Sequence, residues 1–107
     1  MASKTLQVIQ QILEHLDNSM DGDVVDMTAI SPEALEITEA RWHRVIGMMV
    51  EEGLIDGFAK VTTLQTQYNQ YKAITPEITL RGLHFMNENK DAAKLYRIAK
   101  EIRDWIK

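Results

Sequence analysis

Residues 38–55 read TEARWHRVIGMMVEEGLI, and this stretch decides the fold. Thr38 is a typical helix cap, because its hydroxyl oxygen can accept a backbone N–H of the first turn. Gly53 is a typical helix stop, since glycine readily adopts the left-handed conformation that ends a helix. Between them four apolar residues recur at helical spacing, namely Trp42, Val45, Ile46 and Met49. The sequence therefore predicts a helix over residues 38–52, with one buried face, that leads directly into a strand.

A β-hairpin is predicted directly after this helix. Residues 54–55 and 58–61 have the composition of one strand, and residues 71–74 that of its partner. The segment between the strands, residues 62–70, carries no charge. We expect it to form a solvated hairpin tip with one tyrosine packed beneath it.

Two further helices are predicted beyond the hairpin, each started by a capping residue. Thr79 caps the first of them and Asp91 caps the second, which extends over about residues 91–107. The last helix has an apolar stripe at helical spacing, formed by Leu95, Ile98, Ile102 and Trp105.

The N-terminal part of the chain predicts an amphipathic helix over residues 4–17, because apolar residues repeat there at helical spacing. Asp, Asn and Gly residues over 17–23 end this helix in a turn. Residues 24–27 have the composition of a short strand. Ser31 followed by Pro32 is a typical start of a brief helix, because serine caps and proline fits the first helical position.

The order helix, short strand, helix, helix, hairpin is typical of a winged helix-turn-helix. A chain of 107 residues is long enough for one core and one domain. We therefore expect an α+β, mostly helical fold. It would be a single winged-helix domain over residues 1–107, with a β-hairpin wing and an added C-terminal helix over about residues 91–107. An unrelated small α+β domain is the alternative.

The composition and the absence of several motifs argue against several classes of function. The chain has no cysteine, which excludes disulfides and thiolate zinc sites. Its three histidines lack HxxxH spacing and its glycines form no phosphate-binding motif. We therefore predict no catalytic residue, metal, cofactor or small-molecule substrate. The longest nearly apolar run, residues 45–50, is too short to span a bilayer, and no signal-peptide region follows Met1, so a cytoplasmic protein without membrane contact is expected.

The acidic segment over residues 17–28 has part of the spacing of an EF-hand loop. Thr28, however, stands where that loop needs a bidentate carboxylate to complete calcium coordination. An acidic turn is therefore favoured over a calcium site. Weak binding of a divalent ion is the alternative.

Charge is divided unevenly along the chain, whose net charge is −4. Residues 1–71 hold four basic and eleven acidic residues, whereas residues 72–107 hold eight basic and five acidic residues. A DNA-binding protein usually presents a clear basic face, because neutralising phosphates supplies most of its non-specific affinity. Only the C-terminal third could provide such a face here.

Several stretches, together spanning most of the chain, are shared with a known family. They are ITEARW at 37–42, EGLIDGF at 52–58, ITLRGL at 78–83, NEN at 87–89 and AKEIRDWIK at 99–107. On these stretches the chain resembles the YjcQ family, small winged-helix proteins of bacteria, phages and prophages without an established biochemical function. The resemblance implies the winged-helix fold and a bacterial or phage setting, and it carries no catalytic motif.

If the protein binds DNA, the helix over residues 38–52 would enter the major groove. Arg44 could then contact a guanine edge and His43 a phosphate, while Ala40 and Gly47 would permit close approach. Glu51 and Glu52 would face phosphates unfavourably, and an ordinary solvated face is the alternative. The remaining DNA-contact candidates are Tyr68, which could stack on a base, and Lys60 and Lys72, which supply charge near the hairpin tip.

The basic face of the last helix, with Lys94, Arg97 and Lys100, could follow a DNA backbone or meet an acidic partner, including the acidic first half of a second copy. Docking of this helix on its own domain is the alternative.

Protein-interface candidates are Met48, Ile102 and Trp105. The recognition face carries little charge and the domain is acidic, so a non-catalytic protein-interaction module or dimeric adaptor is favoured. The partner would be an unknown protein or a second copy in a homodimer. A small regulator that binds double-stranded DNA is the alternative.

Overall fold

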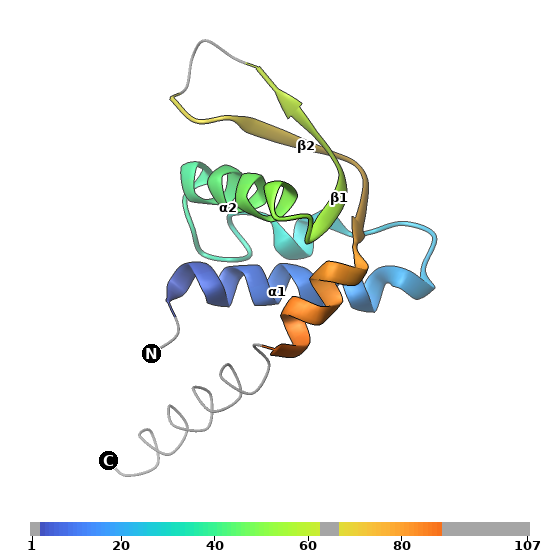
Figure 1. Ribbon diagram of the computed structural model, residues 1–107. Coiled ribbons are helices and arrows are strands. Elements are labelled where there is room, and N and C mark those ends of the chain that lie inside the picture. The colour runs from blue at the N-terminus through green and yellow to red at the C-terminus, as the bar shows by residue number, and fades with distance from the viewer. Residues whose placement is uncertain (1–2, 63–66, 89–107) are drawn as a thin grey trace, which may run out of the picture.

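The structure is a computed structural model that describes residues 3–62 and 67–88. It has an α+β fold with one antiparallel hairpin, as predicted (Figure 1). The elements are the α-helices α1 (Lys4–Asn18) and α2 (Glu39–Glu51), the 3₁₀ helices η1 (Ser19–Asp21) and η2 (Met27–Ile30), and the strands β1 (Ile55–Val61) and β2 (Gln70–Ile78). Residues 80–88 are also helical.

Three layers are stacked in the molecule, with α2 between α1 and the hairpin (Figure 1). Each long helix begins at the predicted kind of cap. Ser3 Oγ accepts the N–H of Leu6 at 3.1 Å, and Thr38 Oγ1 accepts the N–H of Arg41 at 3.1 Å. The predictions of an amphipathic N-terminal helix and of a helix starting after Thr38 are confirmed.

The hydrophobic core lies between α1 and α2 and is closed at one end by the base of the hairpin. Its fully buried side chains include the apolar faces of both helices, namely Ile12, Leu13, Leu16, Val45, Ile46 and Met49, together with Ile30. Complete burial of one such side chain contributes about 1.5–3 kcal/mol. The Trp42 indole Nε1 donates to the Ile30 carbonyl at 2.8 Å, which anchors the segment between the helices to α2.

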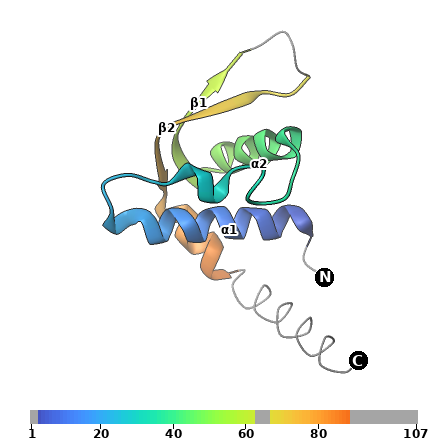
Figure 2. The same ribbon diagram turned by 180° about the vertical axis from the view of Figure 1, so that it is seen from behind.

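The segment between α1 and α2 differs from the sequence-based expectation. The strand predicted over residues 24–27 is wrong, because residues 24–26 form no strand and η2 begins at Met27. The neighbouring edge of the hairpin contains Pro76, which lacks the N–H that a further strand would need. Instead, Asp26 caps η2 by accepting the N–H of Thr28 at 3.1 Å. Figure 2 shows this segment turning back from the end of α1 toward α2.

The brief helix predicted to start at Ser31 is reduced to one turn. Ser31 does act as a cap, since its Oγ accepts the N–H of Ala34 at 3.2 Å. The α-type hydrogen bond from the N–H of Leu35 to the Ser31 carbonyl, at 3.0 Å, closes this turn. Glu36 then takes a φ of 57°, in the left-handed region, so the chain leaves helical conformation before Thr38.

The predicted hairpin is confirmed and is longer than expected. Its register pairs Ile55 with Ile78 at the base and Val61 with Gln70 near the tip. Gly53 has a φ of 72° at the end of α2, which allows the sharp turn from helix to strand. Thr79 joins the two ends of the hairpin base: its Oγ1 donates to the Gly53 carbonyl at 2.5 Å and accepts the N–H of Gly82 at 3.0 Å.

None of the helices in residues 3–62 and 67–88 has the length and hydropathy needed to cross a bilayer. The helix predicted over about residues 91–107 lies outside the described residues, and with it the candidates Lys94, Arg97, Lys100, Ile102 and Trp105.

Candidate functional site

Two surfaces of the described chain combine features of a binding site. The first, which we call the tyrosine cluster, consists of His43, Arg44 and Gly47 on α2 with Tyr68 and Tyr71 from the hairpin. The second, which we call the apolar groove, lies between residues 16–27 and the strand β2.

In the tyrosine cluster, the hairpin folds back over α2, and Tyr71 packs against the helix at Gly47. A Cβ atom added at Gly47 would lie 3.1 Å from Cε2 of the Tyr71 ring and 3.3 Å from its hydroxyl oxygen. The glycine therefore permits close approach, and the group that approaches is the chain's own tyrosine. The face of α2 that we expected to enter the major groove of DNA is thus partly covered at Gly47 by the hairpin.

His43 is held between the helix and the hairpin. Its Nδ1 accepts the backbone N–H of Tyr71 at 3.0 Å, so the neutral ring carries its proton on Nε2. The ring also packs edge-on against Trp42, with centroids 4.9 Å apart, and stacks on Tyr68 at 5.9 Å. Partial burial lowers the pKa of His43 below its ordinary value of 6.5. The negative charge of Glu39 acts in the opposite direction but is the smaller effect. This environment favours a neutral structural histidine over a cation that binds phosphate.

Arg44 is exposed and lies over the ring of Tyr68, with its guanidinium carbon 5.5 Å from the ring centroid. A cation–π contact at such an exposed site stabilises by about 0.5–1 kcal/mol. Arg44, His43 and Tyr68 are therefore brought together, as a DNA-contact hypothesis requires.

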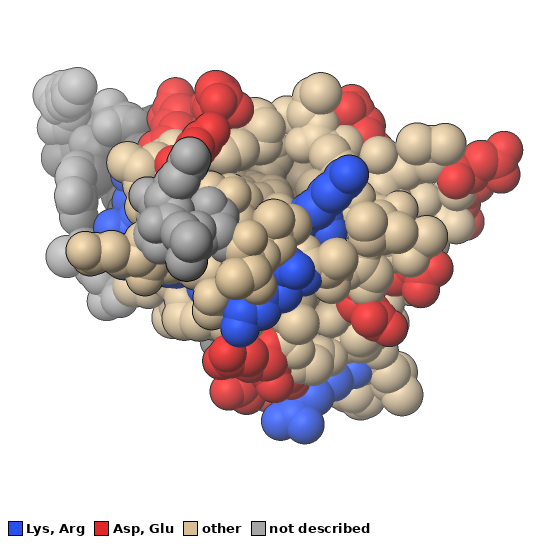
Figure 3. Space-filling model, turned by 90° about the horizontal axis from the view of Figure 1, so that it is seen from above, with Lys and Arg blue, Asp and Glu red and all other residues tan. Residues whose placement is uncertain are grey.

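The two lysines of the hairpin occupy different faces. Lys60 is paired across the hairpin with Tyr71, and Lys72 is paired with Ala59. Because paired residues share a face and consecutive residues alternate, Lys60 lies on the same face as Tyr71 and Lys72 on the opposite face. Seen from above, Lys and Arg groups alternate with Asp and Glu groups over this side of the molecule (Figure 3). The visible face is therefore mixed in charge rather than continuously basic.

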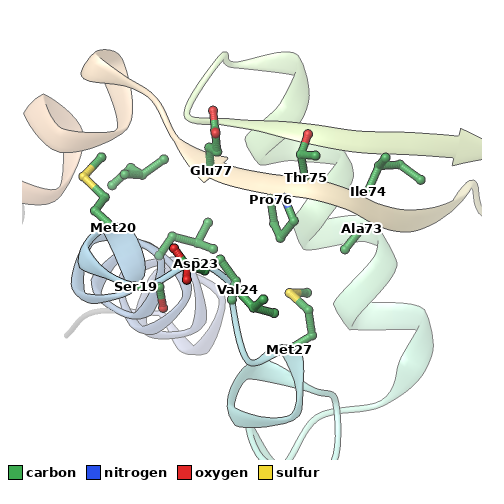
Figure 4. A pocket seen from close by; sticks show the side chains of 14 residues that line it. Ser19, Met20, Asp23, Val24, Met27, Ala73, Ile74, Thr75, Pro76 and Glu77 are labelled. Carbon is green, nitrogen blue, oxygen red and sulfur yellow. The ribbon is translucent and has the colours of Figure 1, made fainter.

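The apolar groove has a volume of about 640 Å³ and is lined by residues 16–27 on one side and β2 on the other (Figure 4). Two apolar side chains of the loop wall are largely exposed, Met20 at 58% and Val24 at 84%, and Ile74 of β2 is 60% exposed and extends away from the loop (Figure 4). Leu16 and Ile78 are buried and link it to the core. A cluster of exposed apolar side chains around one hollow is unfavourable in water unless something covers it.

The charged residues that line the groove are acidic. Asp23 and Glu77 are among the 14 lining residues, none of which is Lys or Arg, and Figure 4 shows the Glu77 side chain extending from β2 away from the loop. Asp21 and Asp26, from the same loop, are exposed beside it. Hydrogen bonds from Thr28 lower the pKa of Asp26, which keeps that carboxylate charged. The groove therefore combines apolar side chains with acidic residues and has no basic residue in its lining.

The loop that forms one wall of the groove is fixed at both ends. Ser19 Oγ donates to the His15 carbonyl at 2.7 Å, and the N–H of Gly22 donates to the Ser19 carbonyl at 3.1 Å. At the other end, His15 Nε2 lies 2.8 Å from the Asp26 carbonyl oxygen. The apolar side chains at Met20 and Val24 are thus carried on an anchored loop.

Sequence reasoning did not find this groove, although it identified residues 17–28 as an acidic turn. Its two walls are more than 40 residues apart in the chain. Within residues 3–62 and 67–88, no group of three or more His, Asp or Glu side chains is placed to hold a metal ion. The remaining protein-interface candidate in the described chain, Met48, is 44% exposed on α2 and lies outside the groove lining.

Comparison with known proteins adds a family relationship. A family model described as YjcQ protein matches residues 10–105. A protein of Bacillus subtilis (strain 168), described as Uncharacterized protein YjcQ, is 32% identical over 80 residues, which cover 75% of this chain and 81% of that protein. No solved structure matches the chain significantly.

Proposed function

Because the chain belongs to the YjcQ family, and the similar Bacillus subtilis protein is described only as uncharacterized, we propose a function from the surfaces of the chain: a non-catalytic protein-interaction module. The proposed framework is a winged helix with a cytoplasmic role in a bacterium or phage. The position of α2 against a hairpin that returns over it supports that framework. The observation that carries the function is the apolar groove.

The groove suits a protein partner better than a nucleic acid. Covering the exposed side chains of Val24 and Met20 with another apolar surface lowers the free energy. The carboxylate of Asp23 at the groove, with those of Asp21 and Asp26 exposed on the same loop, would repel phosphates and attract a basic partner. The anchored loop also presents these groups without a large ordering cost on binding.

A second candidate function, DNA binding, is favoured by the tyrosine cluster. Arg44 lies over Tyr68 beside α2, and Lys60 shares the hairpin face of Tyr71. These groups could contact phosphates or a base edge. Packing of Tyr71 on Gly47 counts against deep insertion of α2 into a groove of DNA, which ranks this function second.

Photo-crosslinking tests the protein-interaction function. A benzophenone amino acid is placed at Val24 in the groove and, as a matched control, at Val61 near the hairpin tip, which is 40% exposed. In a lysate of Bacillus subtilis, the source of the similar protein, the proposal expects protein adducts from position 24 and not from position 61. Equal labelling from both positions, or none from position 24, contradicts it.

Fluorescence anisotropy tests the alternative. Labelled duplex pools are titrated with the protein at two salt concentrations. Binding that weakens steeply with salt and keeps a preferred sequence would support the DNA-binding function. No binding at micromolar protein and low salt would contradict the DNA-binding function.

A further inference from the structure

The apolar groove has a chemistry that a partner must match. It offers apolar contact area at Met20 and Val24 and negative charge on the same loop at Asp21, Asp23 and Asp26. A complementary partner is therefore a segment with one apolar face flanked by Lys and Arg.

The C-terminal segment of the chain has this composition. Residues 90–107 contain six Lys and Arg residues against three Asp and Glu residues. Residues 16–27, which form one wall of the groove, contain four Asp residues and no Lys or Arg. At helical spacing, the segment has an apolar stripe that consists of Leu95, Ile98, Ile102 and Trp105, and the rest of its circumference is mainly basic, with Glu101 and Asp104 among the Lys and Arg residues.

The end of the described chain favours a groove on another copy. The helix over residues 80–88 leaves the base of β2 and crosses α1, moving away from the groove (Figure 1). Gln10 Nε2 donates to the Met86 carbonyl at 3.4 Å, which places Met86 beside the middle of α1. The groove begins at Leu16, about 9 Å farther along α1 at a rise of 1.5 Å per residue. At residue 88 the described chain is therefore directed away from its own groove (Figure 1).

We propose that residues 90–107 of a second copy of this chain occupy the apolar groove, so that two copies exchange their C-terminal segments. Two identical contacts then form about one twofold axis, the commonest symmetry of soluble oligomers. This inference rests on the proposed function, because it names the partner that the groove binds.

Light scattering on the full chain gives the first test. The purified protein is expected at about twice 12.3 kDa, the mass of one chain. Val24→Lys places a positive charge where the basic segment would lie and is expected to weaken the dimer by about tenfold or more. Val24 is 84% exposed, so this variant should fold, which circular dichroism checks. The matched control Val61→Lys should remain a dimer.

Complementation between two variants tests the exchange itself. Trp105→Ala removes an apolar group of the segment, and Val24→Lys blocks the groove. Each variant alone is expected as a monomer at a concentration where the original chain is dimeric. In a mixture, the Trp105→Ala chain supplies an intact groove and the Val24→Lys chain supplies an intact segment. The two variants should therefore form a heterodimer. Absence of a heterodimer in the mixture contradicts the exchange.

Crosslinking of purified protein separates this inference from the proposed function. The benzophenone variant at position 24 is mixed with an equal amount of ¹⁵N-labelled original chain. Adducts that join position 24 to labelled peptides within residues 90–107 support the exchange. A monomeric protein, or adducts only within one chain, overturns it. If lysate adducts from position 24 persist in that case, the protein-interaction function stands; if they are also absent, both fall.

Discussion

Tyr71 closes over Gly47, and this contact fixes the hairpin against α2. The ring comes so close to the helix backbone that a Cβ atom at position 47 would lie 3.1 Å from it. The backbone N–H of the same tyrosine donates to His43 Nδ1 at 3.0 Å. One residue of β2 thus meets α2 with both its side chain and its main chain, one turn apart on the helix.

Gly47→Val is expected to destabilise the protein by about 1–3 kcal/mol, because the added methyl groups must displace the Tyr71 ring. Urea unfolding followed by circular dichroism measures this change. In the Tyr71→Ala background the same substitution should cost nothing or stabilise, since valine has a better helix propensity than glycine. An equal cost in both backgrounds would show that Tyr71 is not the group displaced.

The stability should fall with decreasing pH because of His43. Burial lowers its pKa in the folded protein below the ordinary value of 6.5, and Glu39 opposes this shift only in part. The unfolded chain therefore binds a proton more readily than the folded chain. The stabilising contribution is complete above about pH 6.5 and is lost as the pH falls through the lowered folded pKa. Protonation at Nδ1 would also remove the acceptor for Tyr71.

Unfolding free energies of the original chain and of His43→Gln, compared between pH 8 and 5, measure this effect. The difference between the two proteins isolates His43 from the other titrating groups around it. We expect the original chain to lose more stability than the variant over this range. Parallel profiles would contradict the assignment.

Trp42→Phe should destabilise by about 1–3 kcal/mol, since it leaves the Ile30 carbonyl without the indole N–H and opens a small cavity. Thermal or urea unfolding gives the value. Ile30→Val is the matched control: it trims one methylene from the same contact but keeps the hydrogen bond, at a cost of about 0.5–1.5 kcal/mol. A Trp42→Phe cost no larger than that of the control would mean that the hydrogen bond contributes little.

The long elements of the fold could be predicted because their signals are local. Caps at Thr38 and Thr79 and the apolar spacing of α2 lie within one or two turns of chain. The strand expected over residues 24–27 failed because a strand needs a partner, and Pro76 on the facing edge removes a donor. That edge is about 50 residues away in the sequence.

The candidate surfaces were predictable only in part, for the same reason. The residue types at His43, Arg44 and Tyr68 indicated a possible contact surface, and the structure does bring them together. The sequence could not indicate that Tyr71 occupies the face at Gly47, because this depends on how the hairpin bends over α2. The apolar groove is likewise a product of two distant segments, of which only the acidic loop had a local signal.

If the alternative function holds, Arg44→Ala should weaken binding to a preferred duplex by about 1–3 kcal/mol and weaken binding to other duplexes less. Anisotropy titrations on both duplexes give this ratio. Lys72→Ala, on the opposite face of the hairpin, serves as the control and should reduce binding to all sequences equally or not at all. An equal loss for Arg44→Ala on every duplex would count against base readout.

Met48→Glu should leave the mass of the proposed dimer unchanged. Met48 is exposed on α2 and is not among the residues of the groove, so a charge there faces water in a dimer formed through the groove. Light scattering of this variant beside Val24→Lys therefore locates the interface, because the two substitutions place a charge on different surfaces. Dissociation by Met48→Glu, with Val24→Lys still dimeric, would move the interface to α2, where small and apolar residues suit a protein contact.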